Sequence, residues 1–458
     1  MDLRTSLAVL TARVLSLAGK IAGRQGVTLG GKAALKIDPT ILKKLSSQVK
    51  GDIIVTCGTN GKTTTNNLIA SAYEAEGKKV ICNRTGSNML TGVTDAFLLA
   101  AKLDGTIDAD AAVIEIDEAS TLRVFPFLKP DYMVLTNLFR DQLDRYGEID
   151  ITMNLLKKAM DMAPDMKIIV NADDALSAYL AMESGHSYVT YGISEPHPDS
   201  SSGHEIREGR FCKRCGEKLV YDFYHFSQLG VYHCPKCGFK RPFVDFDASG
   251  IDLRDGLKFS ISSAGGEKKK IRSHYRGFYN AYNILACWSL LKSAGLSAEH
   301  FDQMLDSYHP DNGRNESFRI GGSSVLLNLA KNPAGFNQNI SAVMEDREEK
   351  DLIIVINDNA QDGKDVSWLW DVDFDRLDDP SVRSVTVSGI RCQDMRLRLK
   401  YVSIQAVLTE DVRTAVEDRL RDGCGNIYLL VNYTALYSSR RILKEMSERS
   451  SAKTAARA

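Results

Sequence analysis

The feature that most constrains the fold is a glycine-rich loop between an apolar run at residues 53–55 and a helical stretch at residues 63–76. The loop reads Gly58-Thr59-Asn60-Gly61-Lys62-Thr63-Thr64. Glycines let a backbone turn tightly and direct its N–H groups at phosphate oxygens, beside a helix N-terminus. Lys62 would contact the β- and γ-phosphates, and Thr63 would bind Mg²⁺. The pattern predicts nucleotide binding; a plain strand–helix turn is the alternative, because Thr56 replaces the first Gly of the usual motif.

Acidic residues follow a second apolar run, at residues 111–116. Glu115, Asp117 and Glu118 lie at its end. Ligands of open α/β sheets bind beyond the carboxyl ends of the strands, and Mg²⁺ prefers oxygen ligands. We therefore expect Glu115 to contact Mg²⁺, with Glu118 as a second choice. A solvated acidic strand end is the alternative.

The order of apolar and helical stretches predicts the domain organisation. Apolar runs at residues 79–81, 132–136 and 167–170 alternate with helices, which is typical of a parallel, doubly wound α/β sheet. Further runs at 324–328, 352–356, 382–387 and 427–431 indicate a second α/β, Rossmann-like unit. We expect a helical segment at 1–48, a P-loop domain at 49–308, a C-terminal α/β domain at 309–446 and a flexible tail at 447–458.

An insertion at about residues 205–243 carries two Cys-x-x-Cys-Gly segments. Cys212, Cys215, Cys234 and Cys237 have the spacing of a tetrahedral Zn²⁺ site, and the following glycines permit the tight turns of such a ribbon. Four thiolates leave no open coordination position, so the zinc would be structural. A redox pair or free thiols is the alternative.

The N-terminus and the net charge bear on location and partners. Residues 7–18 are apolar apart from Arg13, which predicts an amphipathic helix within 1–22 rather than an export signal. That helix would cover the first domain, and peripheral contact with the inner face of the cell membrane is the alternative. We expect a cytoplasmic protein with reduced or metal-bound cysteines. The formal net charge of -1 argues against nucleic acid as a partner, although the ribbon has basic residues.

Several segments, in order along the chain, resemble the motifs of the Mur ligases, the ATP-dependent enzymes that build peptidoglycan precursors. They are the loop at 58–64, Glu115, Thr136-Asn137 with Asp141-Gln142-Leu143-Asp144, Gly277 to Asn283, Gly313-Arg314-Asn315-Glu316 and residues 328–333. The resemblance implies ATP and Mg²⁺, with Asn280 near the adenine and Arg314 near the phosphates. Gln142 replaces a metal-binding His of the family, Asn328 replaces an Asp near the ribose, and no Lys is matched to the carbamylated Lys of typical members.

The cysteine insertion and residues 357–371 resemble the amidating members of that family. The resemblance implies that ATP phosphorylates the D-glutamate α-carboxyl of lipid II, and that ammonia from a GatD-type glutaminase subunit converts it to D-isoglutamine in a heterodimer. Asp365 or Asp362 would complete the partner's catalytic set, with Asp358 less favoured; each is also a plausible loop carboxylate. Trp368 and Trp370 would face one side of an extended segment, at the partner interface or in the core. A Mur-type or folylpolyglutamate-type ligase that adds an amino acid is the alternative function.

Overall fold

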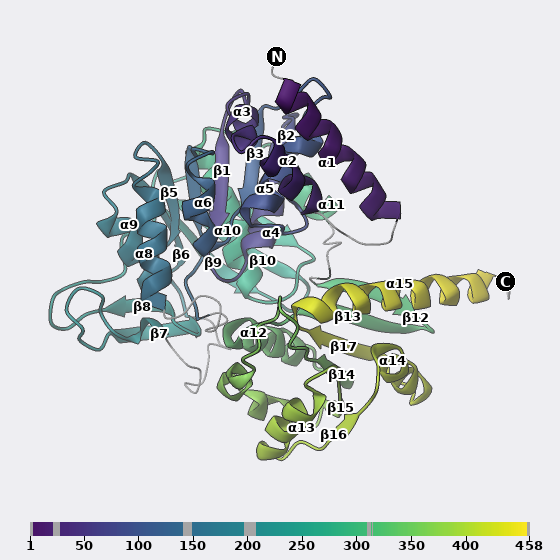
Figure 1. Cartoon of the computed structure of the whole chain (residues 1–458). Coiled ribbons are helices and arrows are strands. Elements are labelled where there is room, and N and C mark those ends of the chain that lie inside the picture. The colour runs from purple at the N-terminus through teal and green to yellow at the C-terminus, as the bar shows by residue number, and fades with distance from the viewer. Residues whose placement is uncertain are drawn as a thin grey trace.

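The computed structural model describes residues 3–21, 28–140, 149–196, 208–308, 313 and 315–455. These residues form a large central sheet with its helices, a smaller C-terminal sheet domain beside it and a two-stranded insertion (Figure 1). No helix within these ranges is both long and apolar enough to cross a membrane.

The central sheet has the strand order β11-β10-β9-β6-β5-β4-β1-β3-β2. Its strands are β1 (Ile53–Cys57), β2 (Val80–Cys82), β3 (Ala111–Glu115), β4 (Tyr132–Leu135), β5 (Lys167–Asn171), β6 (Tyr188–Ile193), β9 (Phe246–Asp252), β10 (Leu257–Ser263) and β11 (Lys268–Ser273). Pairing is parallel from β2 to β9, which confirms the predicted doubly wound sheet. The antiparallel pairs of β10 with β9 and β11 extend the sheet and were not predicted.

Helices cover both faces of the parallel part of this sheet, so β1, β3, β4 and β5 are buried on both sides, whereas β9, β10 and β11 are partly exposed. The helices are α4 (Lys62–Ala75), α5 (Leu90–Ala100), α6 (Thr121–Val124), α8 (Ile149–Met160), α9 (Ala175–Glu183), α10 (Tyr279–Ser293) and α11 (Phe301–Ser307). Along β1, Val55 faces one apolar core and Ile54 faces the other. Helix α11 begins at Phe301, and the Ser297 hydroxyl in the segment before it donates to Glu76 at 2.7 Å.

The N-terminal segment forms α1 (Leu3–Ile21), α2 (Leu29–Ile37) and α3 (Ile41–Ser46). Ala8, Val9 and Ala12 on one face of α1 are buried in the core beside α5, which confirms the predicted helix that covers the first domain. Gly30 lets α2 pack closely on α1, because a Cβ at Gly30 would lie 3.1 Å from the Ala12 carbonyl oxygen.

The C-terminal sheet has the order β12-β13-β17-β14-β15-β16, parallel except for the edge strand β12. Its strands are β12 (Glu316–Ile320), β13 (Ser323–Leu329), β14 (Lys350–Val355), β15 (Val382–Ser388), β16 (Ala406–Leu408) and β17 (Asn426–Val431). Helices α12 (Pro333–Met344), α13 (Cys392–Tyr401), α14 (Val412–Arg421) and α15 (Tyr433–Ala455) surround it. The predicted flexible tail is wrong for residues 447–455: α15 continues to Ala455, and the Ser447 hydroxyl donates to the Arg319 carbonyl at 2.9 Å.

The tryptophan segment is a 3-10 helix, η3 (Ser367–Asp371), and not the extended strand that placed both rings on one side. Trp368 packs on Phe336, with ring centroids 6.1 Å apart. Trp370 is 49% exposed and contacts Tyr401, itself 70% exposed. The two rings therefore have separate surroundings, one in the core and one at the surface.

Candidate active site

The phosphate-binding loop connects β1 to α4 in a backbone conformation that requires glycine. Gly58 has φ 119° and Gly61 has φ 84°. A Cβ on Gly58 would lie 2.3 Å from the Thr136 hydroxyl, and one on Gly61 would lie 2.4 Å from the Asn283 side-chain oxygen. Both positive φ and the close neighbours exclude larger residues. The sequence-predicted loop thus has the expected strand–turn–helix context.

The segment after β4 holds the loop in place. The Asn60 N–H donates to the Asn137 side chain at 2.9 Å, and the Thr136 hydroxyl donates to the Asn60 carbonyl at 2.8 Å. The Thr59 hydroxyl donates to the Phe139 carbonyl and accepts from the Phe139 N–H, both at 2.9 Å. Side chains of a neighbouring strand end therefore preorganise the loop without using the N–H groups at its helical end.

Lys62 is buried at the first position of α4, with Nζ 2.9 Å from Glu118 Oε1. Nζ also donates to the carbonyls of Gly58 and Thr59. Burial alone would lower the pKa of Lys62, but the carboxylates of Glu118, Asp117 and Glu115 outweigh burial and raise the pKa. The side chain is a fixed cation at the loop, and Glu118 is its counter-ion.

Thr63 and Glu115 form the oxygen-rich side of the loop. The Thr63 hydroxyl donates to Glu115 Oε2 at 2.6 Å, and the Asn88 amide donates to Glu115 Oε1 at 2.8 Å. A Cβ on Gly86 would lie 3.2 Å from the Thr63 hydroxyl and 3.4 Å from Glu115 Oε2, so this glycine leaves space beside both oxygens. A hydroxyl and a carboxylate next to the phosphate loop fit Mg²⁺, which binds hard oxygen ligands.

A cavity of about 480 Å³ opens from this loop and lies between the central and C-terminal domains. The central domain contributes the loop, Glu115, Asn137, Asn283 and an apolar group consisting of Tyr191, Phe226, Leu229 and Tyr282. The C-terminal domain contributes Asn328, Lys331, Gln338, Asn339, Gln361 and Tyr433. Asn328, Lys331 and Gln361 belong to segments whose sequence resembles the Mur ligases, whereas Gln338 and Asn339 are isolated polar residues on α12 and have no local signature.

Asparagines connect the two sides of the cavity. Asn332 caps α12 by accepting from the Gly335 N–H at 2.8 Å, and its Nδ2 donates to the Asn60 side chain at 3.0 Å. Asn315 donates to the Tyr279 hydroxyl at 2.8 Å, and the Asn328 amide donates to Asn315 at 3.1 Å. Asn328 thus belongs to a neutral amide network at the cavity wall.

Asn280, which was predicted to lie near the adenine, does not line the cavity. Asn280 is buried in the first turn of α10, donates to the Arg276 carbonyl at 2.7 Å and accepts from Asn283 at 2.9 Å. From this helix the described cavity wall contains Asn283, with Tyr279 and Tyr282, and Asn280 supports it from behind. Arg314 and Gln142 lie outside the described residues.

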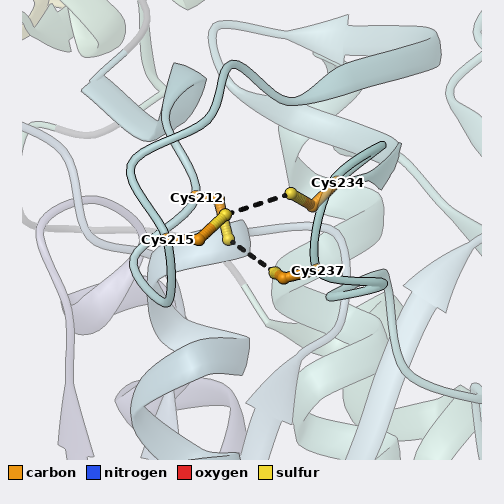
Figure 2. Close-up of side chains that lie close together, drawn as sticks. All are labelled: Cys212, Cys215, Cys234 and Cys237. Carbon is orange, nitrogen blue, oxygen red and sulfur yellow. Dashed lines mark hydrogen bonds between the residues drawn. The ribbon is translucent and has the colours of Figure 1, made fainter.

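The four insertion cysteines converge at one point, as Figure 2 shows. Their sulfur atoms all lie within 4.8 Å of one another, and the pairs Cys212–Cys237 and Cys215–Cys234 are each 3.5 Å apart. A tetrahedral zinc with bonds of ~2.3 Å would place sulfurs ~3.8 Å apart, so the cluster fits that ion. Gly216 and Gly238, both at φ 74°, form the predicted turns.

The histidines near the cluster are not among its ligands. His225 is buried and bonds the Tyr282 hydroxyl at 2.7 Å, whereas the His233 ring is close to Asp222 at the surface. His225 is therefore a packing residue and His233 a surface residue. Burial raises the pKa of the Cys234 thiol, but the N–H groups of Cys237 and Lys236 outweigh burial and lower it to about 7, whereas the pKa values of Cys212 and Cys215 beside it are raised.

The three aspartates of the C-terminal loop have different partners. Asp362 is buried, and both its oxygens accept from Thr434 in the first turn of α15, so it acts as a helix cap. Asp358 is paired with Arg391 at 3.1 Å and with Lys364 at 3.6 Å. Asp365 accepts from the Ser367 N–H at 2.8 Å through Oδ1 and is half-buried; hydrogen bonds from Ser367 lower its pKa. Of the three carboxylates, Asp365 is the one whose described hydrogen bond engages a single oxygen within a local turn.

Comparison with known proteins defines the class first. Residues 55–291 match the Mur ligase middle domain, and residues 329–436 match the MurT ligase C-terminal domain. Among solved structures, a pseudomurein peptide ligase type C from Methanothermus fervidus has TM-score 0.69 at 21% identity, covering 88% of this chain and 80% of that one. MurF from Thermotoga maritima has TM-score 0.63 at 14% identity, covering 93% and 85%. These structures share the Mur ligase fold.

Curated relatives narrow the class. A protein of Staphylococcus aureus (strain COL) named lipid II isoglutaminyl synthase (glutamine-hydrolyzing) subunit MurT is 37% identical over 95% of this chain and 96% of its own length. The protein of the same name from Streptococcus pneumoniae is 32% identical over 97% and 98%. The chain therefore belongs to the MurT family of Mur ligases.

Proposed function

We propose that this chain is the synthetase subunit of a lipid II isoglutaminyl synthase, which amidates the D-glutamate α-carboxyl of lipid II with ATP and ammonia. The observation that carries the proposal is the phosphate loop with Lys62, Thr63 and Glu115 at a cavity that a MurT-type C-terminal domain closes. The full-length similarity to MurT subunits supports this reaction over the addition of an amino acid.

The residues of the chain supply electrostatic stabilisation and positioning. Lys62 and the loop N–H groups offset the negative charge that develops as the γ-phosphoryl group moves to the substrate carboxylate. Mg²⁺, held by Thr63 and Glu115, would neutralise phosphate charge when bound. The resulting acyl phosphate is attacked by ammonia, phosphate leaves, and the amide forms. No protein nucleophile is required, because the substrate carboxylate accepts the phosphoryl group and ammonia attacks the acyl phosphate.

The cysteine cluster is proposed to hold one structural zinc. A closed set of four thiolates leaves no position for substrate or water, so the ion would stabilise the insertion and take no part in the chemistry.

The ammonia is proposed to come from a GatD-type glutaminase subunit that binds the C-terminal domain. Asp365 has one oxygen in a local turn, whereas Asp362 and Asp358 are engaged with Thr434 and with basic side chains. We assign Asp365 to the partner's catalytic histidine, because an aspartate can hold an imidazole in its active tautomer. Trp370 and Tyr401 are exposed in the same C-terminal domain and contact each other. Such aromatic residues are enriched at protein–protein interfaces.

Helix α1 is proposed to contact the membrane surface that carries the lipid-linked substrate. Its outer face has an exposed apolar stripe consisting of Leu3, Leu7, Leu10, Val14 and Leu17. The cavity reaches Thr28 and Met89, near the start of α2, and Lys32 and Lys36 on α2 are exposed and can contact anionic headgroups. Cosedimentation with anionic vesicles should fall when Leu7 and Val14 are both changed to Ser, and unchanged binding would refute this contact.

The proposed reaction is tested by mass spectrometry of lipid II incubated with this chain, ATP, Mg²⁺ and ammonium. A product about one mass unit lighter, formed together with ADP, is expected from the exchange of a hydroxyl for an amine. Glutamine should replace ammonium only when the glutaminase subunit is added. Addition of an amino acid in place of amidation would establish the alternative ligase, and no product under any condition would refute both functions.

A further inference from the structure

The hairpin of the insertion does not lie free at the surface. Strands β7 (Val220–Phe226) and β8 (Leu229–His233) pair antiparallel, with the turn at Ser227 and Gln228. Phe226, Ser227, Gln228 and Leu229 are all buried, Leu229 completely. The cysteines flank the opposite end of the hairpin, because β8 ends directly before Cys234. A seven-residue strand spans roughly 20 Å, so the cluster and the tip are well separated.

The tip is bound to the segment that holds the phosphate loop. Gln228 Nε2 donates to the Leu138 carbonyl at 2.8 Å and to Asp174 Oδ1 at 2.6 Å. Phe139, the residue after Leu138, exchanges two hydrogen bonds with Thr59 of the phosphate loop. The Phe139 ring lies 6.4 Å from the Phe226 ring, measured between centroids. A short path of hydrogen bonds and ring contacts therefore joins the insertion to the loop.

The tip also forms part of the cavity wall. Phe226 and Leu229 line the cavity together with Tyr191 and Tyr282, and this group is an apolar part of the central-domain wall. Leu329, Leu436 and Tyr437 line the cavity from the C-terminal domain. Phe226 packs edge-on against Tyr282 at 5.8 Å, and Tyr282 is fixed by donating to Asp173 at 2.6 Å. A nucleoside triphosphate has a polar phosphate end and a flat base with apolar faces. With the phosphates at residues 58–63, the base meets the apolar wall, where aromatic rings favour it.

We propose that Phe226 and Leu229 are the base-facing wall of the nucleotide cavity, so that the cysteine-bearing insertion takes part in binding the base. The inference rests on the proposed use of ATP at this cavity. It assigns to the insertion a role in ligand recognition in addition to stabilising the fold.

The test is isothermal titration calorimetry of the full-length chain with ATP, GTP and tripolyphosphate, each with Mg²⁺. Phe226→Ala should weaken ATP and GTP binding about 10-fold each and leave tripolyphosphate binding unchanged, because tripolyphosphate has no base. If Phe226→Ala folds poorly, Phe226→Leu serves as the second variant, because leucine fills most of the buried apolar volume without a ring. Phe226→Leu should also lose affinity for ATP.

Phe243→Ala is the matched control, because Phe243 is the last residue of the same insertion but is 75% exposed. It should bind all three ligands like the unmodified chain. If Phe226→Ala and Phe226→Leu both bind ATP and GTP as the control does, the proposed wall is wrong while ATP use stands. If the unmodified chain binds tripolyphosphate and neither nucleotide, or binds nothing, the proposed function itself fails.

Discussion

Asn60 and Asn332 exchange side-chain hydrogen bonds across the domain boundary, although 272 positions separate them in the chain. Asn332 Nδ2 donates to Asn60 Oδ1 at 3.0 Å, and the reverse contact measures 3.4 Å. Asn60 belongs to the phosphate loop and Asn332 caps α12. The position of the C-terminal domain is therefore coupled directly to the loop that we propose to bind phosphate.

Asn60→Ala should reduce the amidation rate about 3- to 10-fold, because a net hydrogen bond contributes ~0.5–1.5 kcal/mol and helps to align the two domains. The melting temperature should hardly change, since the bond lies between domains and not in a core. Asn332→Ala, which also removes the α12 cap, should lower both rate and melting temperature. A normal rate with Asn60→Ala would show that this pair does not align the site.

Lys62→Met should abolish ATP-dependent amidation and also destabilise the protein, because Glu118 would remain buried without its counter-ion. The double variant Lys62→Met/Glu118→Gln should recover most of the melting temperature but none of the activity. Thermal denaturation and ADP release measure the two effects separately. Substantial turnover in the double variant would remove Lys62 from the mechanism.

Asp95 should make stability depend on pH. Burial raises the pKa of this carboxyl to about 6, and its Oδ1 has no hydrogen-bond partner among the described residues. The folded protein thus binds the proton more tightly than the unfolded chain, so this group adds stability as the pH falls from about 7 to about 4 and loses it as the pH rises through 6.

Asp95→Asn should therefore stabilise the protein by about 1–2 kcal/mol at pH 7.5 and by little at pH 4.5, as measured by denaturant unfolding at both values. The control is Asp104→Asn, at a carboxyl whose pKa is lowered by Thr106 and which should give no gain at pH 7.5. An equal effect of Asp95→Asn at both pH values would contradict the assignment.

The unmodified chain should contain about one zinc ion, as a closed four-thiolate site requires. Cys212→Ser should lose the metal and lower the melting temperature, whereas Cys392→Ser, outside the cluster on α13, should keep both. Elemental analysis and thermal denaturation give the two readouts. Metal-free protein of normal stability would count against a zinc ribbon.

Asp365→Asn should abolish the reaction with glutamine and the partner subunit but leave the reaction with ammonium intact. Asp362→Ala should instead lower the melting temperature, because it removes both acceptor oxygens that hold Thr434 in the first turn of α15. The comparison of ammonium with glutamine separates the two roles. Loss of both reactions in Asp365→Asn, at normal stability, would place this residue in the synthetase site instead.

The sequence by itself determined the local chemistry of the site. The phosphate loop, the strand ending at Glu115 and the two Cys-x-x-Cys turns depend on short-range geometry, so residue type and spacing were sufficient to predict them. The sequence also predicted the parallel sheet, because buried strands alternate with helices.

Only the tertiary structure decided which distant residues meet. The pairs Lys62–Glu118 and Asn60–Asn332, and the burial of Phe226 at the cavity, depend on how strands and domains pack, and neutral or isolated side chains have no local pattern that reveals such contacts. Packing likewise converted the polar tail after Ser447 into a continuation of α15 against β12. Its stability comes from contacts with β12, which lies more than a hundred residues earlier in the chain.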